Sequence, residues 1–461
     1  MEKQRVTAVF DIGRTNKKFF LFDQDYREVH REYRVFEETG DEDGYPTEDL
    51  QAVRVWLREV FHRILQARTF DIHAVNFSSY GASLVHLDAD GEVATPLYNY
   101  TKAVDEELLD RFYATYGPED AFAARTGSPR SGLLNSGMQL YWLKHRKPEV
   151  FRRIRYSLHL PQYLSYVFTG IPISEYTSIG CHTALWDYTK QDYHDWVYTE
   201  DLHRLLPPIV STETSINMNY NGKRMKIGVG IHDSSAALLP YVRSEEKPFL
   251  LLSTGTWSVA LNPFASGKLT DRELAANCLN YMRIDGRPVK AARLFLGQEY
   301  KTQIAHLTQH YGVEEDQHRS VAFDQRLYAE IQADYRPRFH FEHLDRSDNP
   351  STTDLPSGSF ARAYHQLIAE LVDAQVHSLE TARGSTCSKK LFLDGGFSDN
   401  AVFLHLLSHR LRDLQLRTTD SSLGSALGAA ICISDRALNS KFLKKNYGVR
   451  KHQPFVVSEI P

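Results

Sequence analysis

The sequence predicts an α/β protein of two domains built on one repeated plan. Its 461 residues suffice for two or three domains at roughly 100–200 residues each, every one able to bury its own core. A strand, a turn with glycine and threonine, and a second strand occur at residues 6–23 and recur at residues 248–263. Unless this recurrence is a coincidence between short hairpins, it indicates a duplicated architecture in which two anion-binding turns face each other.

The composition is that of an ordinary globular protein, with 42% hydrophobic and 24% charged residues. Lysine and arginine number 54 against 58 aspartate and glutamate, so the net charge of -4 gives no general attraction for nucleic acid or an anionic membrane. No apolar run approaches the ~20 residues of a membrane span. The four cysteines are scattered, and the N-terminus shows no signal-peptide pattern. We therefore expect a cytoplasmic protein with reduced thiols.

The first hairpin carries polar groups suited to a phosphate. Its turn holds a carboxylate, a glycine, a hydroxyl and two amines: Asp11, Gly13, Thr15, Lys17 and Lys18. Backbone N–H groups at a glycine turn can approach a phosphate closely, and a carboxylate beside them can hold hydrated Mg²⁺. A purely structural hairpin is the alternative interpretation.

The following segments complete a predicted first sheet. The acidic residues 37–49 are expected to form a solvated loop, and residues 50–68 show the periodicity of an amphipathic helix covering the sheet. The strand at residues 72–77 leads into the polar turn SSYGAS, residues 78–83. Such a turn at the carboxyl edge of an α/β sheet is a common place for a small polar ligand. Residues 161–170 read as a helix that ends at a glycine.

Residues 227–239 form the centre of the chain's functional pattern. Two glycines precede His232 and Asp233, two serines follow, and a run of small apolar residues comes next. The pattern predicts a strand, a tight turn and a helix that starts near Asp233. A carboxylate there is either a general base or metal ligand, or merely the N-cap of the helix.

The second half contains two further helix predictions and a glycine motif. Residues 293–307 and 359–383 show helical periodicity, and a strand at residues 390–396 ends in Gly395 and Gly396 before another helix. Glycines at that point let a ligand lie against the backbone. The glycines at 424 and 428 are expected to permit close helix packing. No Walker or dinucleotide-binding fingerprint is present.

Four motifs in this order resemble the FGGY family of carbohydrate kinases. They are DIGRTNKK at residues 11–18, HDSSAA at 232–237, STGTWS at 253–258 and DGGFSDN at 394–400. The resemblance covers residues 6–432, and its specificity lies in the order of the motifs. Rhamnulokinase-type members are the most similar, through HD at 232–233, GTWS at 255–258, GQE at 297–299 and SEYTS at 174–178.

The resemblance implies the actin/hexokinase-like ATPase fold, with two ribonuclease-H-like domains and a cleft between them. It implies an N-terminal sugar-binding FGGY domain at residues 1–240 and a C-terminal ATP-binding FGGY domain at residues 241–461. The implied activity is that of a carbohydrate kinase, a phosphotransferase with an alcohol group as acceptor, using Mg-ATP as donor. Its partners would be a small sugar and ATP, with neither nucleic acid nor membrane; a homodimer stays open.

The same resemblance assigns roles residue by residue. Asp233 would be the catalytic base, and Asp11 and Asp233 the Mg²⁺ ligands. The ATP- and phosphate-binding residues would be Gly13, Thr15, Lys18, Gly255, Thr256, Gly395, Gly396 and Asn400. The sugar-binding residues would be Ser79, Gly81, Ser83, Asn99, His232 and Asp233.

Departures from the family pattern leave the acceptor open. Rhamnulokinase-type members have an aspartate near Ser83 and an Arg-Asp pair near Asn99 and Tyr100, where this chain has hydroxyl, amide and aromatic groups. We expect a ketose, with L-rhamnulose, L-fuculose and xylulose unranked. Phe397 replaces the third glycine of the adenosine motif. The alternatives are a catalytically silent sugar-binding or regulatory protein and an ATP phosphohydrolase of the same fold.

Overall fold

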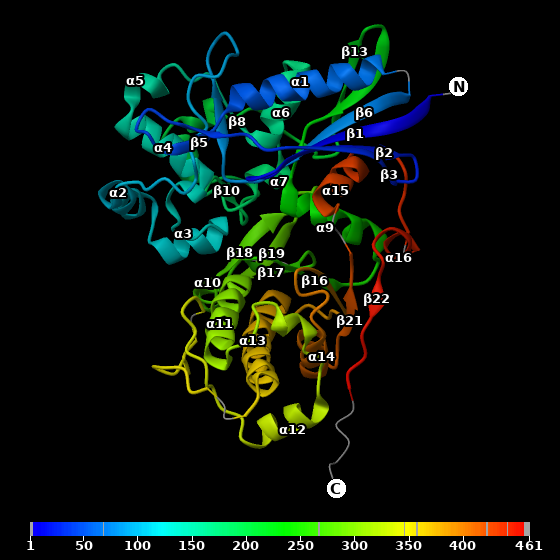
Figure 1. The fold of residues 1–461 in the computed structure, drawn as a ribbon. Helices are drawn as coiled ribbons and strands as arrows, with labels where there is room; N and C mark the ends of the chain where they lie inside the picture. Colours follow the sequence, from blue (N-terminus) through cyan, green and yellow to red (C-terminus); the bar gives the residue numbers. More distant parts are fainter. Residues whose placement is uncertain are drawn as a thin grey trace.

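The chain folds into two halves, stacked one above the other in Figure 1, with the first half at the top. The computed structural model describes residues 3–67, 69–265, 268–344, 346–355, 358–420, 423–439 and 441–455. Within these residues each half is built around a seven-stranded sheet. The α/β fold of two domains predicted from the sequence is thereby confirmed.

The first sheet combines a hairpin with a parallel strand. Its order is β13 (Ser215–Tyr220), β14 (Lys223–Gly228), β6 (Phe70–Ser79), β1 (Gln4–Ile12), β2 (Lys17–Asp23), β3 (Glu28–Arg34), with β15 (Ile231–His232) pairing with β6. Strand β1 runs antiparallel to β2 and parallel to β6, which places Asp11 opposite Lys18 and Ser78. Helices α1 (Leu50–Gln66) and α6 (Leu160–Thr169) cover one face (Figure 1). The sequence predicted both helices, and for α1 also its position on the sheet.

The second sheet has the order β18 (Cys278–Met282), β19 (Pro288–Leu294), β17 (Ser258–Asn262), β16 (Phe249–Thr254), β20 (Lys390–Gly395), β21 (Gln415–Thr418), β22 (Arg450–Lys451). Alternate residues of its strands enter two different cores. Leu250 and Leu252 pack with α13 (Phe360–Arg383), whereas Leu251 and Leu261 pack toward the first half. The remaining elements of this half are α10 (Asp271–Ala275), α11 (Leu296–Tyr311), η3 (Gln317–Ser320), α12 (Gln325–Ala333), α14 (Ala401–Arg410) and α16 (Lys441–Asn446).

Two helices join the halves. Helix α9 (Asp233–Ser244) follows the first sheet, and α15 (Gly424–Cys432) returns from the second half to pack on α9 and on β1 and β6. The helices touch at Gly428, where a Cβ atom would lie 1.8 Å from the carbonyl oxygen of Ala236. Glycine is therefore required there, which confirms the predicted close packing.

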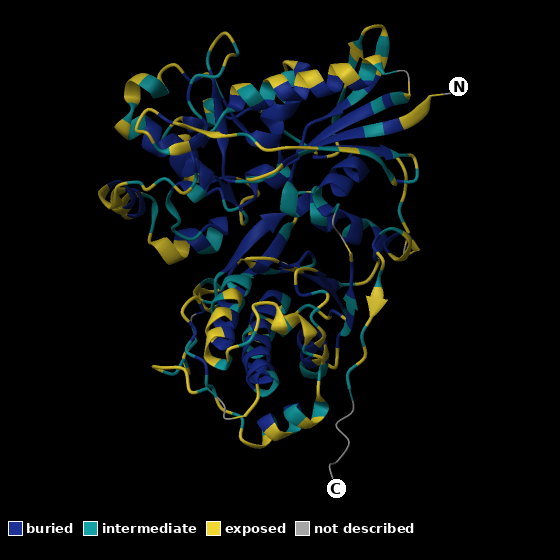
Figure 2. Cartoon of the chain, in the orientation of Figure 1, coloured by how far each residue is buried: buried dark blue, intermediate teal, exposed yellow. Residues whose placement is uncertain are grey.

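An additional layer of short elements lies beside the first sheet and forms its own core. It comprises β7 (Leu84–Leu87), α2 (Glu106–Tyr116), α3 (Glu119–Thr126), η1 (Gly132–Leu134), α4 (Ser136–Arg146), α5 (Pro148–Phe151), β8 (Tyr156–His159), β9 (Ser174–Glu175), α7 (Tyr176–Ile179), β10 (Trp186–Asp187), β11 (Asp192–Tyr193), α8 (Asp195–Thr199), η2 (Leu202–Leu205) and β12 (Ile209–Val210). Figure 2 shows the central strands of both sheets buried, whereas edge strands and the outer faces of α1 and α11 carry exposed residues. No helix in the described parts of the chain is long and apolar enough to cross a membrane.

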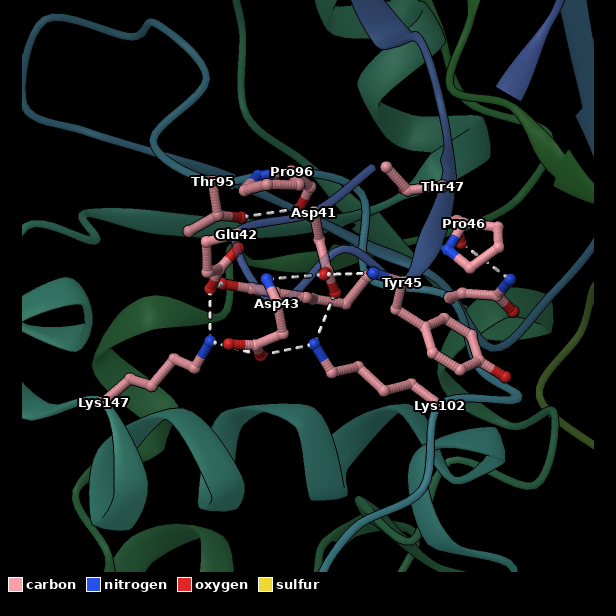
Figure 3. Close-up of polar contacts among 12 residues, drawn as sticks. Asp41, Glu42, Asp43, Tyr45, Pro46, Thr47, Thr95, Pro96, Lys102 and Lys147 are labelled. Carbon is pink, nitrogen blue, oxygen red and sulfur yellow. Dashed lines mark hydrogen bonds and ion pairs between the residues drawn. The ribbon is translucent and has the colours of Figure 1, made fainter. Parts of the chain in front are cut away.

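The acidic segment at residues 37–49 is largely exposed to solvent, as predicted, but it is not a loop, so that part of the prediction was wrong. It forms a hairpin of β4 (Glu38–Gly40) and β5 (Pro46–Glu48). At its tip, Lys102 forms ion pairs with Asp41 and Asp43, and Lys147 forms ion pairs with Glu42 and Asp43 (Figure 3). The sequence did not reveal this clamp because both lysines lie far along the chain.

A second boundary also differs from the prediction. The helix expected at residues 293–307 begins only at Leu296, and β19 extends to Leu294. Arg293 therefore lies on a strand of the second sheet. Strand β19 and helix α11 follow each other so closely that apolar residues at helical spacing continue from the strand into the helix. The spacing therefore predicted the helix too early.

Candidate active site between the two halves

Asp233 lies where the first sheet meets α9. Strand β14 ends at Gly228, the chain turns through Gly230 with φ at 86°, and β15 pairs with β6 before the helix begins. The N-cap residue of α9 is His232, and Asp233 is the first helical residue. The alternative interpretation of Asp233 as the N-cap is therefore wrong.

The Asp233 carboxyl group opens into a cavity of about 920 Å³ between the halves. Its side chain is 35% exposed, and Oδ1 accepts hydrogen bonds from Ser234 N at 2.6 Å and Ser234 Oγ at 3.2 Å. Burial raises the pKa of Asp233 to about 6, against the opposing effect of these bonds. The group is thus accessible and ionises close to neutral pH, as a general base must.

Three of the predicted sugar-binding residues, His232, Gly81 and Ser79, lie together beside Asp233. His232 Nε2 is 3.2 Å from Asp233 Oδ1 and 3.3 Å from Cys181 Sγ, and burial lowers the pKa of His232 to about 4. The ring is therefore neutral at pH 7. A Cβ atom at Gly81 would come within 3.1 Å of this ring, so glycine gives the imidazole its space. Ser79 pairs in register with His232.

Ser83 is buried, and the side chain of Asn99 is occupied by contacts within the protein. The carbonyl oxygen of Ser83 accepts a hydrogen bond from Leu160 N at 3.1 Å. Asn99 Oδ1 accepts a bond from Arg14 at 3.0 Å, while Nδ2 donates to the Pro46 carbonyl. Asn99 therefore anchors a residue of the first glycine turn, and the sugar-binding roles of Ser83 and Asn99 stay predictions.

The first turn brings Asp11 and Lys18 to the cleft. Lys18 Nζ is 3.8 Å from Asp11 Oδ2, and Ser425 Oγ donates to Asp11 Oδ1 at 3.0 Å. Burial raises the pKa of Asp11; Lys18 opposes this shift, and Asp233 adds to it. The two carboxyl groups therefore lie close enough to repel each other when both are charged.

The other groups of the first turn differ in their orientation. Gly13 N donates to the Asn16 carbonyl at 3.0 Å, which closes the turn, and Thr15 is exposed. Lys17 instead forms a buried ion pair with Glu48 at 2.9 Å. Of the two amines that the sequence placed in this turn, only Lys18 faces the cleft carboxylates.

The second turn is exposed and supported by a helix start. Gly255 and Thr256 connect β16 to β17, and the N–H groups of Gly297 and Gln298 donate to the Thr256 carbonyl at 3.1 and 3.2 Å. A Cβ atom at Gly297 would lie 1.9 Å from the Gly255 carbonyl oxygen. The GQE motif thus fixes the conformation of the turn.

The third glycine motif packs against β16, the strand that precedes the second turn. Gly395, with φ at 87°, lines the cavity, and Gly396 N donates to the Thr254 carbonyl at 2.8 Å. Asn400 caps α14, and its Nδ2 donates to Tyr364 Oη at 2.9 Å. Phe397 is buried, so this motif is a firm platform at the wall of the cavity.

Sequence reasoning missed three residues of the cavity wall. Ser425 was included in a packing helix, Tyr281 had no recognisable motif role, and Asp394 opens the DGGFSDN motif without having been assigned a role, yet all three line the cavity with Asp233. The hydroxyl beside the glycines at 424 and 428 was the only available signal for Ser425.

The carboxylates of Asp11 and Asp233 fit a Mg²⁺ ion. Mg²⁺ prefers oxygen ligands and is usually bound by one or two carboxylates together with substrate phosphates and water. The mutual repulsion of these two groups would be relieved by such a cation. The described residues form no cluster of three or more metal-ligating side chains, so the protein would supply only these few ligands.

Comparisons with known proteins agree with this arrangement. A rhamnulokinase from Enterobacter sp. (strain 638) is 24% identical over 274 residues, which are 57% of this chain and 53% of that protein. The match thus spans about half the length of this curated relative.

Among solved structures, a carbohydrate kinase from Novosphingobium aromaticivorans superposes with a TM-score of 0.82 at 24% identity, over 99% of this chain and 96% of its own. A xylulose kinase from Rhodospirillum rubrum gives a TM-score of 0.78 at 16% identity, over 98% and 94%. These likenesses confirm the actin/hexokinase-like fold with a cleft between two domains.

The family comparison extends over both halves. The N-terminal domain of the FGGY family of carbohydrate kinases matches residues 6–238, and the carbohydrate kinase FGGY C-terminal domain matches residues 246–441. The chain belongs to the FGGY family of carbohydrate kinases.

Proposed function

We propose that this protein transfers the γ-phosphoryl group of ATP to a hydroxyl group of a ketose, such as L-rhamnulose, L-fuculose or xylulose. The observation that carries the proposal is Asp233, a carboxylate with a raised pKa that opens into the cavity between the halves. The family, and the glycine motif whose Gly395 lines that cavity, support a kinase. We place the reaction in the cytoplasm, where ATP is available.

The residues around the cavity would divide the reaction between them. Asp233 accepts the proton of the sugar hydroxyl. At the same time the hydroxyl oxygen forms a bond to the γ-phosphorus, and the bond between that phosphorus and ADP breaks. ADP leaves with the electrons of the broken bond. His232, neutral and next to Asp233, is positioned to hydrogen-bond the acceptor.

The second half and the first turn would orient the donor. The glycine turns at Gly13 and at Gly255 and Thr256 would let phosphate oxygens approach the backbone, and Lys18 would provide a positive charge. Asp11 and Asp233 would hold Mg²⁺, which neutralises phosphate charge when bound. Gly395, Gly396 and Asn400 would form the platform for adenosine.

The test is ADP release by the purified protein with Mg-ATP across a panel of ketoses, aldoses and polyols, beside Asp233→Asn. We expect slow ATP consumption alone, faster consumption with one sugar class, and a loss of kcat of about 10²–10⁴-fold in the variant. Binding of an ATP analogue should persist in Asp233→Asn.

Three other results would refute the proposal in different ways. ATP consumption indifferent to every sugar would indicate a phosphohydrolase. Binding of sugar and ATP without turnover would indicate a silent or regulatory protein. A sugar-dependent rate retained by Asp233→Asn would remove Asp233 from the role of base.

A further inference from the structure

Arg450 lines the cavity between the halves from the last described segment of the chain. It belongs to β22, at one edge of the second sheet. The cavity wall near it also includes Gly448, Asp420 and Asp399. The family comparison matches this half only up to residue 441, so neither the sequence motifs nor the matched domain gives Arg450 a role.

The segment around Arg450 is fixed by contacts on both sides of it. Tyr447 is buried, and its carbonyl oxygen accepts a hydrogen bond from Asp420 N at 2.9 Å. On the other side, His452 N donates to the Leu416 carbonyl at 3.0 Å. Arg450 is therefore held at the cavity wall by its neighbours, independently of what its own side chain binds.

The side chain of Arg450 has one exposed partner within the protein. Its Nη2 donates to Asp399 Oδ1 at 2.8 Å, and the two side chains are 59% and 80% exposed. An ion pair so exposed contributes little to stability, because water screens it and both side chains lose freedom. The guanidinium group is thus available to a ligand in the cavity.

Arg450 and Asp233 lie toward opposite ends of the cavity. Ser235, in the first turn of α9, donates to the Met282 carbonyl at 2.9 Å, which places the beginning of α9, and Asp233 with it, beside β18. Strand β18 forms one edge of the second sheet and β22 the other, and residues of β17, β16 and β20 line the cavity between them. At about 4.8 Å per strand, roughly 20–30 Å separate the two edges.

This separation determines which part of the donor lies near Arg450. In the proposed reaction the transferred phosphoryl group lies next to Asp233, which takes the proton of the attacking hydroxyl group. The rest of ATP then extends toward the other end of the cavity, and the nucleoside is its last part. Gly395, proposed above as part of the adenosine platform, lines the cavity from β20, between the two edges.

A planar guanidinium group suits the face of a nucleobase. It stacks on aromatic rings and is more weakly hydrated than an ammonium group. Among the described residues that line the cavity, Tyr281 is the only aromatic one, and it belongs to β18, at the Asp233 end. Arg450 therefore provides the flat group at the other end.

We propose that Arg450 binds the nucleoside of the donor, with its guanidinium group against the face of the base. This inference rests on the proposed kinase activity. Stacking is tolerant of base identity because every base has a π face. The donor site should therefore accept GTP as well as ATP.

The experiment measures the binding of adenosine, AMP, ADP and GDP by calorimetry, without any acceptor, in the unaltered protein and in Arg450→Gln. We expect Kd to rise about 10-fold in the variant, and by a similar factor for all four compounds, because each loses the contact with its base. With an acceptor that is phosphorylated, KM for ATP should rise by a similar factor while kcat stays almost unchanged.

Lys451→Gln is the matched control. Lys451 is the next residue of β22, so its side chain points to the opposite side of the strand, and it is not part of the described cavity wall. Both substitutions remove one positive charge from the same exposed strand. We expect Lys451→Gln to bind all four compounds like the unaltered protein, and thermal unfolding shows whether both variants are folded.

The outcomes separate the inference from the kinase proposal. Losses for AMP, ADP and GDP with adenosine unaffected would place Arg450 at a phosphate and overturn the inference. Equal losses in Arg450→Gln and Lys451→Gln would indicate a general effect of charge and also overturn it. Unchanged binding in folded Arg450→Gln overturns it and leaves the kinase. Nucleoside binding that depends on Arg450, in a protein that phosphorylates no sugar, supports the contact and contradicts only the kinase activity.

Discussion

The raised pKa of Asp233 predicts a pH dependence for the reaction. A general base works only when deprotonated, so kcat/KM for the acceptor should rise about tenfold per pH unit below pH 6 and level off above it. His232 is neutral throughout this range because burial lowers its pKa to about 4. Initial rates between pH 4.5 and 8 at saturating Mg-ATP provide the measurement. An acidic limb near pH 4 would instead indicate a carboxyl group in an ordinary environment.

The same pKa shift has the opposite sign for stability. The folded protein holds a proton on Asp233 up to about pH 6, whereas the unfolded chain releases it near the ordinary value of 3.8. The free energy of unfolding therefore falls as pH rises through this window. Above pH 6 the charged carboxylate of Asp233 lowers the stability of the folded protein. Such a loss of stability at a reactive site is a common relation between activity and stability.

Among the secondary-structure elements, the acidic hairpin depends most clearly on a single ion pair. The side chain of Asp41 is 1% exposed and that of Lys102 is 9% exposed. Removal of Lys102 would leave a buried carboxylate without its partner. We therefore expect Lys102→Met to lower the free energy of unfolding by about 3 kcal/mol in urea denaturation.

Lys147→Met is the matched control for this experiment. Lys147 forms ion pairs with Glu42 and Asp43, whose side chains are 38% and 50% exposed, so its loss should cost at most about 1 kcal/mol. Because Lys102 lowers the pKa of Asp41, the difference between the variants should be present at neutral pH and vanish as Asp41 becomes protonated in acid. Equal losses for the two variants would contradict the buried role of Lys102.

The sequence predicted those helices and glycine contacts whose signal lies within one short segment. The helix α13 followed from its apolar spacing, and the glycine at 428 followed from its place in a small-residue run. Contacts between distant segments left no such signal. The clamp on Asp41, and the position of Arg293 opposite Val259, depend on pairings that only the folded chain defines.

At the scale of the whole molecule, the repeated hairpin was the sequence feature that best predicted the two-domain architecture. Two strand-turn-strand units indicated paired domains with polar turns, and the structure has a sheet around each unit. The surroundings of His232 were harder to predict, because Gly81 and Cys181, which both contact its ring, come from segments far apart in the chain. The pairing of β15 with β6 brings His232 to them within the first half.

The cavity between the halves predicts that they close on their substrates. An open volume of about 920 Å³ around Asp233 leaves water free to compete with the acceptor, and closure would exclude it. The two halves meet through α9 and α15 and also where α3 and α7 contact α10 and β18, so closure requires a change at this second contact. Small-angle scattering should therefore give a smaller radius of gyration with acceptor and a non-hydrolysable ATP analogue than without ligands.

Asp233→Asn sharpens this measurement, since the variant should bind acceptor and authentic Mg-ATP without turnover. We expect each ligand alone to produce part of the compaction and both together to produce all of it, because acceptor and donor would contact different halves. Scattering profiles that superimpose with and without both ligands, in protein shown by calorimetry to be saturated, would mean that water is excluded by the ligands themselves and not by movement of the halves.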